Sequence, residues 1–321
     1  MMFLVKNTYY LKVILFCIFP FLSSCDSGVQ VAEYDLDDRV DVSDVIGQPA
    51  DKELSNIYIF SFDLRASPQE DARQYLPFLK YLERETGYQF KLRFTSKNRN
   101  IVDEVGTNHV QFAALGAVSF LKANTHYDVV PVVRGLNFEN KAEYQSVFVV
   151  SPDSKIKSLS EIRDKRLAFG SRSSTQGHLI LRIVLNKNNI ELQAFSSIVF
   201  TGSHQNCANS VISKKADVCA MQDTMAKNME KKNLLRIIHS SSNYPSSGIV
   251  ANRNVSKEVL TKVKQALINF KPQGKHKSGL YHWERTEMPL GFTSAHINDY
   301  SELKKWAVRL GFIQKPLVNN E

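Results

Sequence analysis

Arg166-Leu-Ala-Phe-Gly170 leads into Ser171-Arg-Ser-Ser-Thr-Gln-Gly-His178, and the apolar run 179–185 follows directly. The first five residues predict a strand, the next eight a polar turn, and the run a helix. Strand, turn and helix in this order are the unit from which α/β proteins are built. The segment therefore indicates a layered α/β fold.

The polar turn is also the best candidate for chemistry. A helix N-terminus presents unpartnered backbone N–H groups and about half a positive charge, which together attract anions. Ser174 and Thr175 supply hydroxyl donors there, Gly177 permits close approach to the backbone, and His178 carries a ring N–H. The alternative is that Ser174 or Thr175 only caps the helix. The Gly-x-x-x-x-Gly-Lys pattern of a nucleotide P-loop is absent from this turn.

A second turn of the same kind is Thr201-Gly-Ser-His204, which follows an expected strand at 197–200 and precedes an expected helix at 207–213. Ser203 is expected to cap that helix, with the helix N-terminus facing the same cleft as the first turn. A purely structural histidine is the alternative for His204.

Short apolar runs and helical stretches alternate from residue 57 onward, which predicts two α/β lobes. Tyr75, Phe78, Leu79 and Leu82 fall at helical spacing, with Pro77 near the start of that helix and Gly87 at its end. The other expected helices are at 101–105, 118–123, 178–185, 207–213, 257–270 and 300–310. The expected strands are at 57–62, 90–94, 111–115, 129–133, 146–150, 166–169, 197–200, 217–221, 235–238 and 249–251.

The composition is that of a globular protein, with 43% hydrophobic and 23% charged residues in a chain of 321. Collagen, coiled-coil, low-complexity and disulfide-stapled miniprotein classes are thereby excluded. The length suggests about two domains.

The N-terminus predicts export. Lys6 and Lys12 precede an apolar run of about ten residues, too short to span a bilayer, and the run ends in Leu22-Ser-Ser-Cys25. This resembles a bacterial lipobox, so residues 1–24 are expected to be a lipoprotein signal peptide and Cys25 to carry the lipid. An ordinary secretory signal is the alternative. Asp26 resembles an inner-membrane retention signal of Gram-negative lipoproteins; in a Gram-positive host the anchor would be the cell membrane.

Charge is unevenly distributed along the mature chain. Residues 26–53 hold nine acidic and two basic residues, whereas the chain from Leu54 holds 37 basic and 23 acidic residues. The acidic segment, with Cys25, is expected to be a solvated tether (25–53). The basic body favours an anionic ligand or partner, and export disfavours nucleic acid.

Cysteine spacing gives no metal signature. Cys207 lies in an expected helix and Cys219 in an expected strand, and we interpret them as two small buried apolar residues, with a disulfide as the alternative. Neither a Cys-x-x-Cys pair nor a His-Glu-x-x-His motif is present, so no metal or cofactor is expected.

An ordered series of motifs resembles the substrate-binding proteins of phosphate, phosphite and phosphonate ABC transporters, which have the periplasmic-binding-protein type II fold. The resemblance spans about residues 56–310. It includes Tyr75-Leu-Pro-Phe-Leu-Lys-Tyr-Leu82, Phe112-Ala-Ala-Leu-Gly116, Tyr144-Gln-Ser146, Asp153-Ser-Lys-Ile-Lys-Ser-Leu159, Phe169-Gly170, Ser174-Thr-Gln-Gly-His-Leu179, Thr201-Gly-Ser-His204 and Ala216-Asp217. The resemblance implies a ligand cleft at a hinge between lobe one (54–147 plus 246–321) and lobe two (148–245).

The resemblance also implies that Ser174, Thr175 and His178 grip the ligand oxyanion, with Gly177 permitting close approach. The chain departs from the family at Gln176, where serine is frequent, and at Gln205, where some members carry an acid that grips an amino group. A zwitterionic aminophosphonate is thereby disfavoured, unless Asp223 substitutes. Further candidates for lining the ligand pocket are Leu115, Phe62 and Tyr144, with core packing as the alternative for Phe62 and Tyr144.

We therefore expect a monomeric, non-enzymatic, membrane-anchored receptor that closes on a small phosphorus oxyanion and delivers it to an ABC permease. One alternative is a module that reports its ligand to a membrane sensor, and another is a binding protein for a different small ligand. A phosphoester hydrolase and the superfamily's iron-binding branch are others; the sequence shows neither a catalytic serine elbow nor a paired-tyrosine ligand set.

Overall fold

The computed structural model describes residues 56–63, 67–95 and 99–314. The expected signal peptide, Cys25 and the acidic tether lie outside the described residues. Within these ranges, no helix combines the length and apolar character needed to cross a bilayer.

The first lobe is built on a six-stranded sheet in the order β13-β4-β12-β3-β1-β2. β1 pairs in parallel with β2 and β3, whereas β12 runs antiparallel to β3 and β4, and β13 runs antiparallel to β4. The strands are β1 (Ile57–Phe62), β2 (Gln89–Leu92), β3 (Phe112–Leu115), β4 (Val130–Gly135), β12 (Gly248–Ala251) and β13 (Phe292–Ser294). The last two strands come from the C-terminal third of the chain, so two distant segments complete this lobe.

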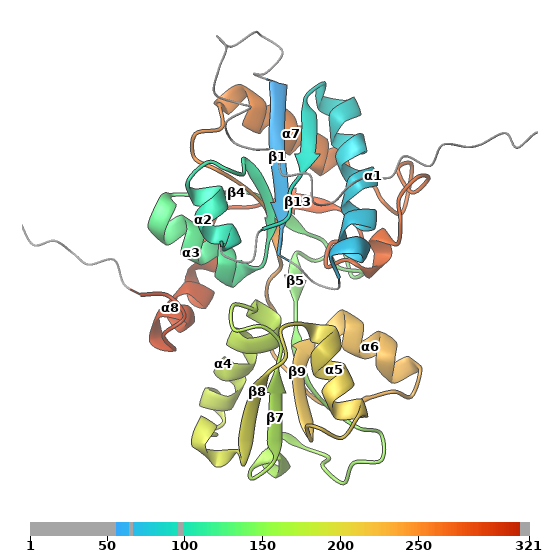
Figure 1. The fold of residues 1–321 in the computed structure, drawn as a ribbon, viewed down its shortest axis with the longest axis vertical. Coiled ribbons are helices and arrows are strands. Elements are labelled where there is room, and N and C mark those ends of the chain that lie inside the picture. The colour runs from blue at the N-terminus through green and yellow to red at the C-terminus, as the bar shows by residue number, and fades with distance from the viewer. Residues whose placement is uncertain (1–55, 64–66, 96–98, 315–321) are drawn as a thin grey trace, which may run out of the picture. The chain divides into compact units, whose positions relative to one another are not determined.

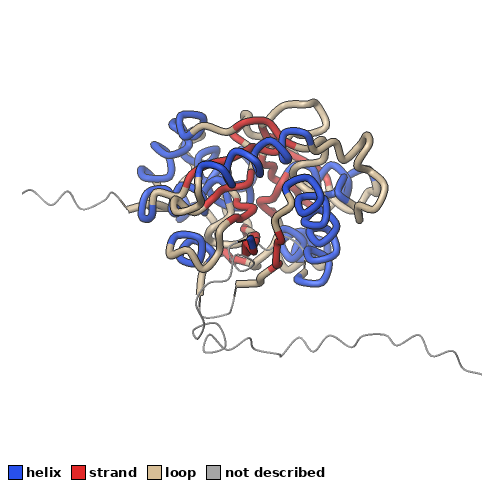
Figure 2. Tube along the Cα trace, turned by 90° about the horizontal axis from the view of Figure 1, so that it is seen from above, coloured by secondary structure: helices blue, strands red, loops and turns tan. Residues whose placement is uncertain are grey.

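Helices cover both faces of the first sheet (Figures 1 and 2). One face packs on α1 and α7 through an aromatic core, and the other packs on α2, α3 and α8. The helices are α1 (Pro68–Thr86), α2 (Ile101–Gly106), α3 (Ala117–Tyr127), α7 (Lys257–Asn269) and α8 (Ser301–Arg309), with short 3₁₀ turns η6 (Trp283–Arg285) and η7 (Ile297–Tyr300).

Helix α1 shows how local signals set an element's ends. Ser67 caps it by accepting a hydrogen bond from the Glu70 amide, Pro68 occupies the first turn, and Gly87 ends it at a φ of 69°. The helix therefore starts well before Pro77, which lies inside it, so the predicted start near Pro77 was wrong. The buried residues include those at the predicted helical spacing.

The second lobe is built on a five-stranded sheet in the order β10-β6-β9-β7-β8. β7 lies between β8 and β9 and is parallel to both, and β6 is antiparallel to β9 and β10. The strands are β6 (Ser146–Val150), β7 (Arg166–Phe169), β8 (Ser197–Phe200), β9 (Val218–Gln222) and β10 (Arg236–Ser240).

Helix α4 packs on one face of the second sheet, and α5 and α6 pack on the other. A π-helical turn, η4, precedes α4 without a break, so the predicted strand, polar turn and helix of residues 166–185 are confirmed. The elements are η4 (Thr175–Leu179), α4 (Ile180–Lys187), α5 (His204–Ile212), α6 (Asp223–Lys231) and the 3₁₀ turns η3 (Leu159–Ile162) and η5 (Leu192–Ala194).

Two short strands join the lobes. β5 (Glu143–Tyr144) and β11 (Tyr244–Pro245) pair antiparallel, with Tyr144 opposite Tyr244. The chain enters the second sheet after β5 and returns after β11, so the two-lobed α/β fold is as predicted. The lobe boundaries after residues 147 and 245 remain a prediction; β6 already begins at Ser146.

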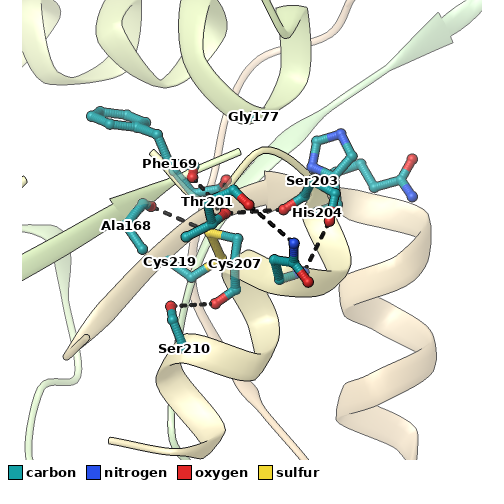
Figure 3. The surroundings of a disulfide bond; sticks show 12 residues. Ala168, Phe169, Gly177, Thr201, Ser203, His204, Cys207, Ser210 and Cys219 are labelled. Atoms are coloured by element: carbon teal, nitrogen blue, oxygen red, sulfur yellow. Dashed lines mark hydrogen bonds between the residues drawn. A yellow bond between two sulfur atoms is a disulfide. The ribbon is translucent and has the colours of Figure 1, made fainter. Parts of the chain in front are cut away.

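Cys207 and Cys219 form a disulfide, so the interpretation as two free buried residues was wrong. The predicted elements were right, because Cys207 lies on α5 and Cys219 on β9. Helix α5 packs across β9 and brings the two Cα atoms to 5.7 Å, within bonding range (Figure 3). Sequence spacing alone does not reveal this crossing.

Candidate functional site

A cavity of about 230 Å³ lies between the two lobes. Most of its lining follows the carboxyl ends of parallel strands, where α/β sheets form their ligand crevices. Asp63 and Gly116 follow β1 and β3 of the first sheet, and the polar turns follow β7 and β8 of the second. The lining residues are Asp63, Gly116, Tyr144, Ser171, Ser173, Ser174, Thr175, Gln176, Gly202, Ser203, His204, Ser247 and Glu287.

The first polar turn folds around Ser174. The Ser174 Oγ accepts a hydrogen bond of 2.8 Å from the Gly177 amide and thereby caps η4. The Gly170 amide donates to the Gly177 carbonyl at 3.1 Å, which fixes the turn to the end of β7. A serine that accepts in this way keeps its own proton to donate. Capping and ligand binding are therefore compatible roles for Ser174.

Gly177 allows the two polar turns to approach each other. A Cβ at this position would lie 2.9 Å from His204 Cε1 and 3.0 Å from Ser174 Oγ, both too close for an ordinary contact. Gly177 thus lets η4 pack directly on the His204 ring. The sequence predicted close approach of a ligand to this backbone, which stays a prediction; the structure shows close approach of the second turn.

The second polar turn opens α5. Ser203 Oγ accepts from the Asn206 amide at 3.1 Å and caps the helix, as predicted. His204 is buried, and its Nδ1 accepts from the Gln222 amide at 3.3 Å. This hydrogen bond assigns the proton of the neutral ring to Nε2. The same residue therefore lines the cavity and ties α5 to β9.

Thr175 and Gln176 are both buried in the cavity wall, with 4% and 3% of their surface exposed. Thr175 Oγ1 accepts from the Val118 amide of the first lobe at 2.9 Å. Gln176 Nε2 donates to the Gln145 carbonyl at 2.7 Å and to Asp223 Oδ1 at 3.2 Å. Gln176 therefore links the turn to the residue between β5 and β6 and to the first residue of α6.

The first lobe supplies the acidic part of the lining. Asp63 accepts from the Gly116 amide at 2.9 Å and from the Ser119 hydroxyl at 3.2 Å, and Ser247 donates to Glu287. These two carboxylates are the only Asp, Glu, Lys or Arg side chains among the described lining residues. The net positive charge of the body is thus not concentrated in the lining. The second-lobe wall instead offers neutral hydrogen-bond donors and two helix N-termini, at Ser174 and Ser203.

His178 does not line the cavity. Its ring lies 4.8, 4.7 and 4.5 Å from the rings of Phe169, Phe200 and Phe312. Nδ1 lies 2.9 Å from the Arg172 carbonyl, and Nε2 is buried without a hydrogen-bond partner among the described residues. Burial lowers the pKa of His178 to about 4, so the ring is neutral at pH 7. Its expected role as a ligand donor is therefore not supported by this placement.

Five other candidates also lie outside the cavity lining, namely Gly177, described above, and the four that follow. Phe62 stacks on Tyr75 at 4.5 Å, Leu115 is buried in the core under α3, and Gln205 is exposed and donates to Asn209. Asp223 contacts Gln176 and pairs with Lys227 at 3.1 Å, instead of facing the ligand space. Tyr144, by contrast, lines the cavity as expected.

Several lining residues were not predicted from the sequence, namely Asp63, Gly116, Ser171, Ser173, Gly202, Ser247 and Glu287. The signal for Asp63 was present, since it is the residue after a buried strand, next to the candidate Phe62. Consecutive strand residues point to opposite faces, so Phe62 enters the core while Asp63 reaches the cavity. No comparable signal marks Glu287, which lies on the loop before β13.

Within the part of the chain that the structure describes, no group of three or more histidine, cysteine, aspartate or glutamate residues is placed to hold a metal ion.

Comparisons with known proteins identify the family of the chain. A family model described as "ABC transporter, phosphonate, periplasmic substrate-binding protein" matches residues 60–300. The phosphonates-binding periplasmic protein of Escherichia coli (strain K12) is 28% identical over 64% of this chain and 63% of its own length. The probable ABC transporter phosphite binding protein PhnD1 of Prochlorococcus marinus (strain MIT 9301) is 28% identical over 54% of each chain. The chain thus spans between half and two thirds of the length of these curated relatives.

Solved structures show the same fold. PhnD1 from Prochlorococcus marinus, in complex with methylphosphonate, has a TM-score of 0.71 at 19% identity and covers 80% of this chain and 99% of its own. A binding protein component of an ABC phosphonate transporter from Pseudomonas aeruginosa has a TM-score of 0.68 at 21% identity, covering 79% and 86%. With the family match over most of the described residues, the chain belongs to the phosphonate-binding family of periplasmic substrate-binding proteins of ABC transporters.

Proposed function

We propose that this protein captures a small phosphorus oxyanion between its lobes and delivers it to an ABC permease. One observation carries the proposal: two capped helix N-termini, at Ser174 and Ser203, lie on one wall of the same cavity. Hydroxyl donors and helix termini bind phosphoryl oxygens without a counter-ion. Relatives described as phosphonate- and phosphite-binding proteins support this ligand class.

The ligand's remaining groups would face the first lobe. Asp63 and Glu287 are hydrogen-bond acceptors when ionised, so they favour a ligand that presents a P–OH or an ammonium group to that wall. A sulfate ion has no such donor at neutral pH. The cavity of about 230 Å³ suits a small ligand.

The proposal also covers export of the protein and its attachment to a membrane. Membership of a periplasmic family implies export. We further propose a lipid on Cys25, an acidic tether over residues 26–53, a monomeric body, and binding without catalysis. A sensor role in place of transport stays open as an alternative, which a neighbouring kinase gene would favour over a permease gene.

The test is calorimetric titration of the purified mature protein with phosphate, phosphite, methylphosphonate, 2-aminoethylphosphonate and sulfate. We expect one phosphorus oxyanion to bind and sulfate not to bind. The double variant Ser174→Ala/Thr175→Ala is expected to lose at least about fivefold in affinity, since two neutral hydrogen bonds contribute roughly 1–3 kcal/mol.

Ser256→Ala is the matched control. Ser256 caps α7 by accepting from the Val259 amide, just as Ser174 caps η4, but it does not line the cavity. The loss of a helix cap is thereby separated from the loss of a ligand contact. Equal affinities of the double variant and the wild type would refute this site, and failure of all five anions to bind would refute the ligand class.

A further inference from the structure

The hydrogen bond between Thr175 and Val118 joins the two lobes at the edge of the ligand cavity. Helix α3 begins at Ala117 behind Gly116, which has no side chain to cap it. The first N–H groups of any helix lack partners within the helix. Here the partners come from elsewhere: Asp63 accepts from the Gly116 amide, and Thr175 Oγ1 accepts from the Val118 amide at 2.9 Å.

Thr175 therefore acts as a capping residue for a helix in the other lobe. It lies on η4, 57 positions away in sequence, and is 4% exposed. The three residues are closely packed, since a Cβ at Gly116 would lie 3.3 Å from Thr175 Oγ1 and 3.5 Å from Asp63 Oδ2. Apolar contacts continue the same interface, since Leu179 and Ile180 pack in one cluster with Phe120 of α3.

The Thr175 hydroxyl can serve the ligand at the same time. A hydroxyl has one proton to donate and two lone pairs to accept with. Val118 uses one lone pair, which leaves the proton for an acceptor in the cavity that Thr175 lines. Hydrogen bonds in such a chain polarise one another, so each strengthens the next. The α3 macrodipole adds to this effect, because Val118 belongs to its positive end.

We infer that Thr175 couples ligand binding to closure of the lobes, through the chain Val118 N–H to Thr175 O–H to ligand oxygen. This inference rests on the proposed function. It adds a second role for Thr175, which is to hold helix α3 of the first lobe against the polar turn. A ligand shifts a conformational equilibrium only through contacts that differ between the states. The hydrogen bond from the Val118 amide to Thr175 differs between the open and closed states, because it can form only when the lobes meet.

Val118→Pro tests the chain, because it removes the amide donor and leaves Thr175 intact. Proline is tolerated in the first turn of a helix, where the N–H has no intrahelical partner. Val118→Ala is the matched control. Both variants lose the buried valine side chain, but only Val118→Ala keeps the backbone N–H. We expect the ligand to dissociate about tenfold faster from Val118→Pro than from Val118→Ala, since one hydrogen bond is lost. Association rates should differ by less than about threefold.

Thr175→Val and Thr175→Ser provide a second route that does not depend on proline. Valine has the shape of threonine without the hydroxyl, whereas serine keeps the hydroxyl and should stay closer to wild type. In the Thr175→Val background, Val118→Pro should add little to the loss, since both substitutions break the same chain. Equal dissociation rates for Val118→Pro and Val118→Ala would overturn the inference.

Hydrogen exchange with and without ligand separates this inference from the proposed function. The Val118 amide is expected to exchange faster in Thr175→Val than in the wild type in both states. The difference in the ligand-free protein reports how often the lobes meet, and it should reach at least about tenfold when bound ligand holds the lobes closed. The Gly116 amide, bonded to Asp63, should change little. Unchanged protection of Val118 would overturn the lobe contact whatever the protein binds. A faster Val118 exchange in a protein that binds no phosphorus oxyanion would support the contact and refute the proposed ligand.

Discussion

Replacing Gly177 by alanine should weaken ligand binding without unfolding the protein. The new methyl group would meet His204 Cε1 at 2.9 Å and Ser174 Oγ at 3.0 Å. Carbon atoms in favourable contact lie about 3.5 Å or more apart, so the His204 ring must retreat by about half an ångström. The two polar turns would then shift relative to each other, although the side chains of Ser174, Ser203 and His204 are all still present.

The magnitude follows from the hydrogen bonds that this shift disturbs. Distorting the contacts of Ser174 and His204 with a ligand oxyanion would cost about 1–2 kcal/mol, or roughly 5- to 30-fold in affinity. Alanine is favoured over glycine in helical backbone by roughly 0.5–1 kcal/mol, which offsets part of the steric cost. We therefore expect the free energy of unfolding to change by less than about 1 kcal/mol.

Gly170→Ala is the control, because it introduces the same methyl group on the neighbouring segment. At that position the nearest atoms would be Gly177 Cα at 3.6 Å and His204 Nδ1 at 3.7 Å, which are ordinary contacts. Calorimetric titration of both variants with the ligand of the wild type measures the effect, and urea denaturation measures stability. Equal affinities for Gly170→Ala and Gly177→Ala would refute the steric argument.

Three further predictions concern other parts of the molecule. Reducing the disulfide, or replacing Cys207 and Cys219 by alanine, should lower the free energy of unfolding by about 3 kcal/mol for a loop of 12 residues, as measured by denaturation with and without reductant. His178 has a pKa of about 4 when folded and about 6.5 when unfolded, so the unfolded chain binds more protons between these values. Stability is then lost as pH falls from 6.5 to 4, by up to about 3 kcal/mol, and His178→Leu should flatten that slope in urea titrations at pH 4.5 and 7.5. Cys25→Ser should abolish incorporation of labelled fatty acid and release the protein from membranes; unchanged labelling would refute the proposed anchor.

The fold was largely predictable because it follows from local patterns. Apolar runs such as 57–62 and 197–200 match β1 and β8, and the spacing of apolar residues around Phe78 identified α1. Helix α6 was not predicted, since its buried residues are only Asp223 and Ala226 and its sequence is mostly polar. A helix with so small an apolar face gives a weak periodic signal.

The residues that line the cavity were predicted where they lie together in one segment, and they were missed where the tertiary fold brings distant segments together. The turns at Ser174 and Ser203 each show strand, cap and helix in consecutive residues, which is a local signal. Asp63 and Glu287 line the same cavity although more than 200 residues separate them in the sequence, so no local pattern connects them. His178 was expected to face the ligand, but its ring packs against Phe169 and Phe200. Which way a side chain points from η4 depends on how that turn packs, and the sequence does not show this.

The most direct test of the account is a crystal structure of the protein with the phosphorus oxyanion that binds most tightly in solution. We predict that the phosphorus atom lies between the two polar turns, with its oxygens accepting hydrogen bonds from the Ser174 and Thr175 hydroxyls and from the N-terminus of α5 at Ser203 and His204. The Thr175 to Val118 contact should persist in the complex. An oxyanion bound outside this cavity, or held by lysine and arginine side chains, would contradict the account.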